Sequence, residues 1–310
     1  MYYYCLYGLS IASDLAFSQL TSISEDEANQ QPDQLIHVCK SPISTDISHT
    51  KSGYFYIGEK RSYLHNDHIF MEICNGTTIH YETEPNCNLE YVRSFLLGYG
   101  MSMLCLQRNI LTFHCSAIEK GGYAYLISGE SGCGKSTLTG KLLQQGCGFL
   151  ADDIAAVLFE GEQPIIPPTF PYQKLCRDAA LSQGYDPKDL IYIDEEKDKF
   201  LVPMHELAIS HPIPFHSFVY LFVHNGKELI YEKLEGMDKF IQLIENQFLR
   251  HLLGERKFAP SIGQCCLNIA KEIEVHVIGR PRNSYVVDEI CHIFDSQIFH
   301  DTRVKRTELT

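Results

Sequence analysis

The sequence lacks the features that would place this protein in a membrane or outside the cell. None of its apolar runs reaches the about 18 residues that mark a transmembrane helix. Residues 1–17 have neither a basic start nor an uninterrupted apolar segment, so they predict a strand rather than a signal peptide. The 12 cysteines include no C-x-x-C pair and no zinc-like spacing with histidine. Reduced thiols in a cytoplasmic protein are therefore expected.

Positive charge is also scarce. Lys and Arg number 26 against 39 Asp and Glu, which gives a net charge of −13 at pH 7. Such a surface disfavours nucleic acid as a partner, and the absence of a long apolar run disfavours a membrane. The 310 residues, 45% of them hydrophobic, are enough for one large domain or two modest ones. No pattern indicates an oligomeric state.

Residues 1–95 are expected to form a β-rich N-terminal module. Strands are predicted from apolar or alternating runs at residues 2–11, 36–40, 53–58, 69–74 and 77–82. Asn75-Gly76 predicts a tight hairpin between the last two runs. The polar segment 22–34 is expected to be a loop.

A helix over residues 88–107, with Asn88 as its N-cap, is expected to link this module to a second, α/β domain spanning residues 96–300. Residues 301–310 are expected to be a polar tail. In the second domain, residues 164–171 are expected to be irregular and 177–199 to be a polar, mobile surface segment. Further strands are predicted at residues 110–118, 123–128, 149–157, 217–223 and 274–278. Further helices are predicted at residues 137–145, 237–253, 260–271 and 286–294.

The most specific pattern is G-x-x-x-x-G-K-[ST] at residues 129–137, between a predicted strand and a predicted helix. Its glycines allow backbone N–H groups to surround phosphate oxygens, Lys135 adds a positive charge, and Ser136 offers a hydroxyl to Mg²⁺. The sequence therefore predicts a nucleotide-phosphate site with Mg²⁺. Its cofactor-binding residues are Gly129, Glu130, Ser131, Gly132, Cys133, Gly134, Lys135, Ser136 and Thr137.

Two adjacent aspartates end the next predicted strand. Residues 136–151, 16 in all, separate Lys135 from Asp152 and Asp153. The chain thus returns directly from the phosphate loop to two carboxylates. One carboxylate can hold Mg²⁺, and the other can accept a proton from an attacking hydroxyl.

Other charged residues have weaker patterns. Lys197 and Lys199 lie in an acidic run. They could face transferred phosphate or an acidic substrate, but such a run is more typical of a solvated surface. Arg280 follows a strand and is a candidate phosphate ligand. Arg250 and His251 flank a helix end and are expected to be structural.

The segments FHCSAIE (residues 113–119), GESGCGKST (129–137) and FLADDIAAV (149–157) resemble the C-terminal domain of HPr kinase/phosphorylase. The chain looks most similar to the HPr-kinase-like proteins of bacterial ribosomal-peptide clusters, including lasso-peptide kinases. Their opening and their late arginines resemble YGLSIAS (7–13) and RPR (280–282). The resemblance is specific over residues 113–157 and looser elsewhere. The E-hydrophobic-R-G-hydrophobic-G signature of the bifunctional enzymes is absent, so phosphorylase activity, a hexamer and HPr recognition do not follow.

The resemblance implies a kinase related to phosphoenolpyruvate carboxykinases that transfers a phosphoryl group from ATP to a serine hydroxyl. Its partner would be a peptide or protein, such as a ribosomal precursor peptide. By position, Lys135, His114 and Asp152 are the implied catalytic residues, with Asp152 as proton acceptor. Ser136 and Asp153 are the implied metal ligands, although the two aspartates can exchange roles.

Two other functions fit the same residues. One is a kinase of a small hydroxylated metabolite, which would need no peptide. The other is a regulatory module that binds a nucleotide and transfers nothing.

Overall fold

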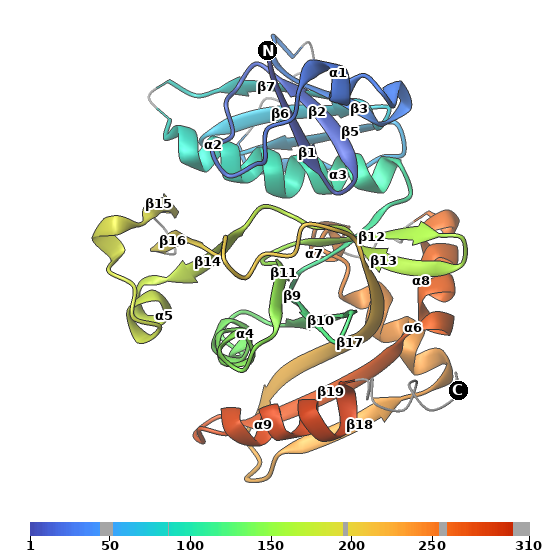
Figure 1. Cartoon of the computed structure of the whole chain (residues 1–310). Coiled ribbons are helices and arrows are strands. Elements are labelled where there is room, and N and C mark those ends of the chain that lie inside the picture. The colour runs from blue at the N-terminus through green and yellow to red at the C-terminus, as the bar shows by residue number, and fades with distance from the viewer. Residues whose placement is uncertain (44–51, 86, 195–197, 254–258, 300–310) are drawn as a thin grey trace.

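The fold is described by a computed structural model for residues 1–43, 52–85, 87–194, 198–253 and 259–299. It is mixed α/β, as predicted, with an N-terminal sheet above a larger unit (Figure 1). The expected tail at residues 301–310 lies outside the described residues. Within the described part of the chain, no helix is long and apolar enough to cross a membrane.

The N-terminal sheet has the strand order β1-β2-β3-β7-β6-β5-β4. The predicted hairpin at Asn75-Gly76 is confirmed, with φ angles of 54° and 66° in the left-handed region that such a turn requires. The sequence did not predict β5. The strands are β1 (Tyr2–Leu6), β2 (Leu9–Ser13), β3 (Leu35–Lys40), β4 (Tyr54–Tyr56), β5 (Arg61–His65), β6 (Ile69–Cys74) and β7 (Thr78–Thr83).

The polar segment 22–34, expected to be a loop, contains α1 (Glu25–Ala28) and η1 (Pro32–Gln34). Ser24 and Glu27 cap the start of α1 reciprocally, and Ala28 is fully buried. The loop prediction was wrong here because a capping box and one apolar contact are enough to fix a single turn.

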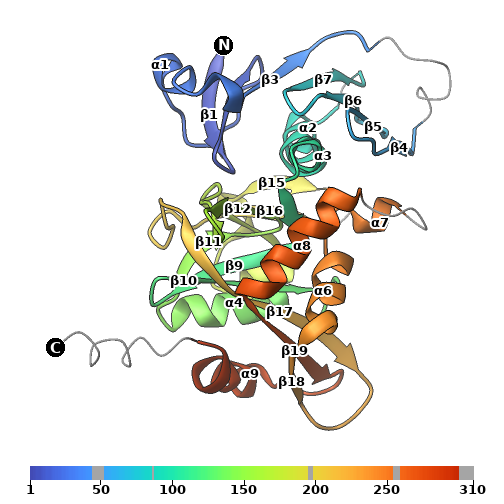
Figure 2. The same cartoon turned by 90° about the vertical axis from the view of Figure 1, so that its right-hand side faces the viewer.

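A continuous helix follows the sheet and is built from α2 (Leu89–Phe95), η3 (Leu96–Gly100) and α3 (Met101–Gln107). The Asn88 side chain accepts the N–H of Glu90 at 2.9 Å, which confirms the predicted N-cap. The helix lies between the sheet and the larger unit (Figure 2). Its buried residues join the N-terminal core on both sides of residue 95, so the expected division at that residue falls inside one packed helix.

The larger unit is organised around β17, at which its sheet branches. The sheet has the order β11-β9-β10-β17-β13-β12-β8, and β19 joins β17 while β18 joins β19. Strands β10, β17 and β19 run parallel. The strands are β8 (Leu111–Phe113), β9 (Cys115–Lys120), β10 (Tyr123–Gly129), β11 (Gly148–Ala151), β12 (Ala155–Glu160), β13 (Gln163–Ile166), β17 (Ile213–His224), β18 (Ile230–Leu234) and β19 (Glu274–Pro281).

Helices cover both faces of this sheet. One core contains buried residues of α6 and α8, and the other contains buried residues of α4 and α9. The helix predicted over residues 237–253 is broken between α6 and α7. The helices are α4 (Lys135–Gln144), α6 (Gly236–Glu245), α7 (Arg250–Leu253), α8 (Pro260–Glu272), α9 (Val287–Ile293) and the π-helical turn η5 (Phe294–Ile298).

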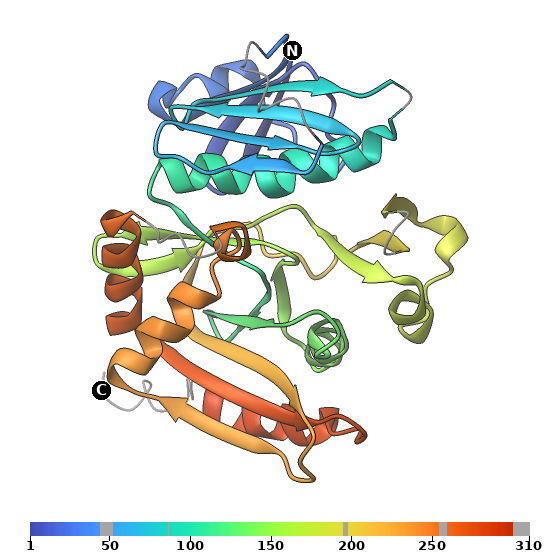
Figure 3. The ribbon, with the colours of Figure 1, turned by 180° about the vertical axis from the view of Figure 1, so that it is seen from behind.

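A small sheet projects below α2 (Figures 1 and 3). Its order is β14-β16-β15, with β14 (Tyr172–Cys176), β15 (Ile191–Asp194), β16 (Lys199–Pro203), α5 (Arg177–Ser182) and η4 (Pro187–Asp189). The segment 177–199, predicted to be polar and mobile, thus contains α5, η4 and β15, which the sequence did not predict. Ala180 and Ile193 of this segment are buried, and Ala180 belongs to the core that also contains residues of α4 and α9. Lys197 lies outside the described residues.

Candidate functional site

The predicted phosphate loop is a tight connection between β10 and α4, which confirms the strand, loop and helix order. The backbone φ angles of Gly129, Gly132 and Gly134 are 146°, 80° and 102°, values that residues other than glycine rarely adopt. A Cβ atom on Gly129 would lie 2.1 Å from the carbonyl oxygen of Leu221. Lys135 Nζ donates to the carbonyls of Gly129 at 2.5 Å and Glu130 at 3.1 Å. The loop thus keeps its lysine directly over its own backbone.

Arg280 supports this loop from β19. Its Nε donates to the carbonyl of Cys133 at 2.6 Å, and its Nη2 donates to the carbonyl of Gly132 at 3.1 Å. Because the C=O and N–H of one peptide unit point in opposite directions, the N–H of Gly134 points away from Arg280. In this structure Arg280, expected as a candidate phosphate ligand, instead orients the loop that would bind phosphate.

Asp152 is a buried carboxylate at the end of β11, with an exposed fraction of 7%. Ser116 Oγ donates to its Oδ1 at 2.6 Å, and the backbone N–H of Lys174 donates to its Oδ2 at 2.8 Å. Burial raises the pKa of Asp152 to about 6, although the bond from Ser116 lowers it in part. Both oxygens are therefore occupied within the protein.

Asp153 turns in the opposite direction, because its φ of 73° places it in the left-handed region. Its Oδ2 pairs with Lys174 Nζ at 2.8 Å, and its Oδ1 lies 3.7 Å from His114 Nδ1. Burial alone would raise its pKa, but the charge of Lys174, joined in acid by that of protonated His114, holds the pKa of Asp153 well below its usual value. Asp153 is thus an ionised carboxylate with one side facing open space.

His114 separates β8 from β9, where the sequence predicted one unbroken strand. Its Nδ1 lies 3.0 Å from the carbonyl oxygen of Asp153, so that nitrogen carries a proton and donates it. Partial burial lowers the pKa of His114, and the charge of Asp153 raises it in part. The imidazole is therefore neutral at neutral pH, with Nε2 available as an acceptor.

A cleft of about 710 Å³ lies between the α2–η3–α3 helix, the phosphate loop and the small sheet. Asp153, His114 and the start of the phosphate loop line it, whereas Asp152 does not. The remaining lining comes from distant segments. Its residues are Tyr91, Ser94, Phe95, Gly98, Tyr99, Ser128, Lys174, Ile193, Lys199, Tyr220, Glu245, Asn246, Gln247, Phe248, Arg250 and His251.

Several of these residues had only weak patterns in the sequence. Lys174 and Lys199 lie on neighbouring antiparallel strands, with Lys174 opposite Leu201, so they share one face of the small sheet. Lys199, expected on a solvated surface, instead lowers the pKa of Asp153 through its charge. Arg250 and His251, expected to be structural, also line the cleft. Only the alternation of β14 and β16 could have indicated the lysines, and the strands themselves were missed.

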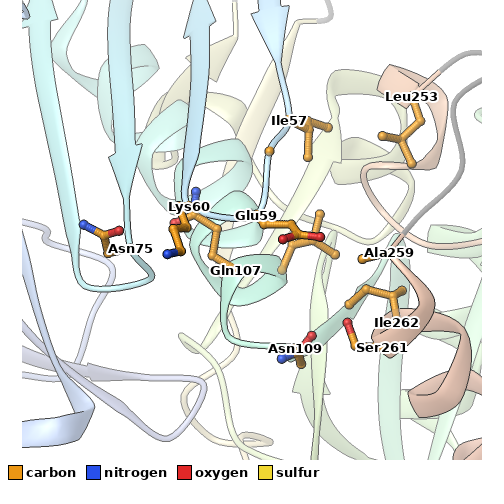
Figure 4. Close-up of a pocket in the computed structure, with 12 residues that line it drawn as sticks. Ile57, Glu59, Lys60, Asn75, Gln107, Asn109, Leu253, Ala259, Ser261 and Ile262 are labelled. Carbon is orange, nitrogen blue, oxygen red and sulfur yellow. The ribbon is translucent and has the colours of Figure 1, made fainter.

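A second cavity, of about 690 Å³, lies between the turn after β4 and α8 (Figure 4). Ile57, Lys60, Gln107 and Ile262 are among its lining residues. None of the described residues that line it belongs to the phosphate loop or the aspartate pair. His114, Asp153 and the start of the phosphate loop therefore line the first cleft, whereas Asp152, Lys135 and Ser136 are not among its lining residues.

Comparison with known proteins gives little further information. No protein-family model matches the sequence, and no curated protein matches it. Among solved structures, the chain is similar to the HPr(Ser) kinase/phosphatase from Coxiella burnetii, with 14% identity and a TM-score of 0.31 over 63% of this chain and 98% of that chain. A likeness of this size does not establish function, so the site is interpreted from its own geometry.

Proposed function

We propose that this protein is a kinase that transfers the γ-phosphoryl group of Mg·ATP to a serine hydroxyl of a peptide or protein. One observation carries the proposal: the start of the phosphate loop and the ionised carboxylate of Asp153 line the same cleft. Phosphoryl transfer depends mainly on positioning and on neutralising charge, and this cleft supplies groups for both. Lys135 and Lys199 would act on the charge of the phosphates.

The two oxygen ligands available here suit Mg²⁺ better than a metal ion that needs all its ligands from the protein. Among the described residues, no group of three or more His, Cys, Asp or Glu side chains is placed to hold a metal. Mg²⁺ usually binds to one or two protein oxygens and completes its shell with phosphate and water. Ser136 and Asp153 would hold it here, and the bound ion would neutralise charge on the phosphate oxygens.

The proposal departs from the sequence prediction in the part given to Asp152. The metal ligand must be a carboxylate in the cleft, and Asp153 meets this requirement. The proton of the serine hydroxyl would pass to Nε2 of the neutral His114, which lines the same cleft, as the hydroxyl oxygen bonds to the γ-phosphorus and ADP leaves. Asp152 has the pKa of a useful base, but its two oxygens already bind Ser116 and the backbone of Lys174. We therefore propose Asp153 as the catalytic carboxylate and Asp152 as a positioning residue.

The test uses Mg·ATP, synthetic serine-containing peptides and mass spectrometry to detect a gain of one phosphate. Lys135→Ala and Asp153→Asn are expected to abolish the gain, whereas Asp152→Asn retains part of it. Lys141→Ala is the matched control, because Lys141 lies on the same helix and pairs with Asp288 away from the cleft. ATP hydrolysis without transfer to any peptide would contradict the proposal, and turnover of free serine would indicate a metabolite kinase.

A further inference from the structure

The cleft has an aromatic wall, made of Tyr91, Phe95, Tyr99 and Phe248. Successive ring centroids lie 4.8, 5.5 and 5.2 Å apart along this series. Tyr91, Phe95 and Tyr99 recur every fourth residue, so they lie on one face of the α2–η3–α3 helix. At about 1.5 Å per residue, these three span about 12 Å along the helix axis.

The aromatic wall begins beside the reacting groups. The ring of Phe248 lies 6.1 Å from that of His114, which in turn contacts Asp153. Burial raises the pKa of Tyr99, and the nearby charge of Asp153 raises it further. Because Nε2 of His114 would accept the proton of the incoming hydroxyl, the rings extend from the acceptor side of the cleft.

The small sheet forms an adjoining wall of the cleft. Ile193 and Lys199 belong to this sheet, and its strand β15 packs against α2. A bound chain would therefore meet aromatic rings on one wall and the positive charge of Lys199 on the wall beside it. That local positive charge contrasts with the net charge of −13 of the whole protein.

The geometry points to the aromatic wall as the binding site for the acceptor, which is an extended peptide segment with apolar side chains facing the rings and an acidic side chain facing Lys199. This inference rests on the proposed kinase function. An extended chain rises about 3.3 Å per residue and alternates its side chains, so three or four residues match the length of the wall. A small metabolite would contact one ring and leave the others unused.

The test measures binding rather than transfer. Fluorescein-labelled peptides with one serine are titrated into the full chain loaded with Mg²⁺ and a non-hydrolysable ATP analogue, and anisotropy is recorded. Peptides with Phe or Leu on one side of the serine and Asp on the other are expected to bind about tenfold more tightly than peptides with Gly at those positions.

Variants assign this preference to each wall. Phe95→Ala is expected to remove the preference for apolar residues, Phe95→Leu to keep part of it, and Lys199→Met to remove the preference for Asp while leaving that for apolar residues. Leu89→Ala is the matched control, because Leu89 lies on α2 but is 49% exposed and does not line the cleft. Circular dichroism establishes that each variant is folded.

Two outcomes would overturn the inference. Equal affinity for all peptides in the native chain would show that the rings do not recognise the acceptor. An equal loss of affinity for the ATP analogue and the peptide in Phe95→Ala would assign the rings to adenine instead. Since binding is measured directly, a failure of phosphate transfer refutes the proposed kinase function without deciding the role of the wall.

Discussion

The charges of Asp152 and Asp153 are expected to change the free energy of unfolding in opposite directions. Burial raises the pKa of Asp152 from an ordinary 3.8 to about 6, so the folded chain binds a proton there more tightly than the unfolded chain. The ionised carboxylate then destabilises the fold above about pH 6, and the difference in pKa corresponds to about 3 kcal/mol. This cost decreases as the pH falls from about 6 towards 3.8.

Asp152→Asn is therefore expected to raise the free energy of unfolding at about pH 8 by up to about 3 kcal/mol. The amide can keep both contacts, since its oxygen can accept the N–H of Lys174 and its NH₂ can donate to Ser116 Oγ. The gain should nearly vanish at about pH 4.

Asp153→Asn should act in the reverse direction. The pKa of Asp153 is lowered in the folded chain, so its charge stabilises the fold above the unfolded pKa and this contribution is lost as the pH falls. Its replacement should destabilise the protein at neutral pH and matter less in acid.

Urea unfolding followed by circular dichroism measures both effects, because the chain contains no Trp to report by fluorescence. A loss of stability in Asp152→Asn at about pH 8, or a gain that does not depend on pH, would refute the reasoning.

Three further predictions concern the phosphate loop and its charges. Arg280→Met should weaken binding of a fluorescent ADP analogue about tenfold, since two charged hydrogen bonds to the loop are lost, and an unchanged Kd would contradict this. Gly129→Ala should lower the free energy of unfolding by about 3 kcal/mol or more, because its Cβ collides with backbone. Gly122→Ala, where no atom lies within 4 Å of the added Cβ, should lower the free energy of unfolding much less. Thermal unfolding of the two variants compares these effects. Lys199→Met should raise the pKa of the nearby carboxylates, so the acid limb of the kcat–pH profile should move to higher pH.

The sequence predicted those parts of the fold that depend on local chemistry. The turn at Asn75-Gly76, the N-cap at Asn88 and the glycines of the phosphate loop each need particular residues in a short segment, and these are visible without a structure. α1 could also have been predicted, because Ser24 and Glu27 have the spacing of a capping box.

The breaks in regular structure were harder to predict, and several fall at the site. Uninterrupted strands were expected through His114 and through Asp152-Asp153, yet each strand ends at those residues. The aromatic wall could not be predicted from the sequence either, because its rings come from residues 91–99 and from residue 248. Only packing over long sequence distances brings these segments into one cleft.

The core beneath the N-terminal sheet also contains Ile154, Ala156, Phe248 and Leu249 from the larger unit. Ile154 directly follows the catalytic candidate Asp153, and Phe248 belongs to the aromatic wall. In evolutionary terms, the N-terminal sheet is therefore not an exchangeable attachment. Recombination that replaced the sheet at a junction between residues 83 and 110 would also change one side of the cleft. Selection for acceptor binding and selection for the stability of the first strands therefore act on the same part of the sequence.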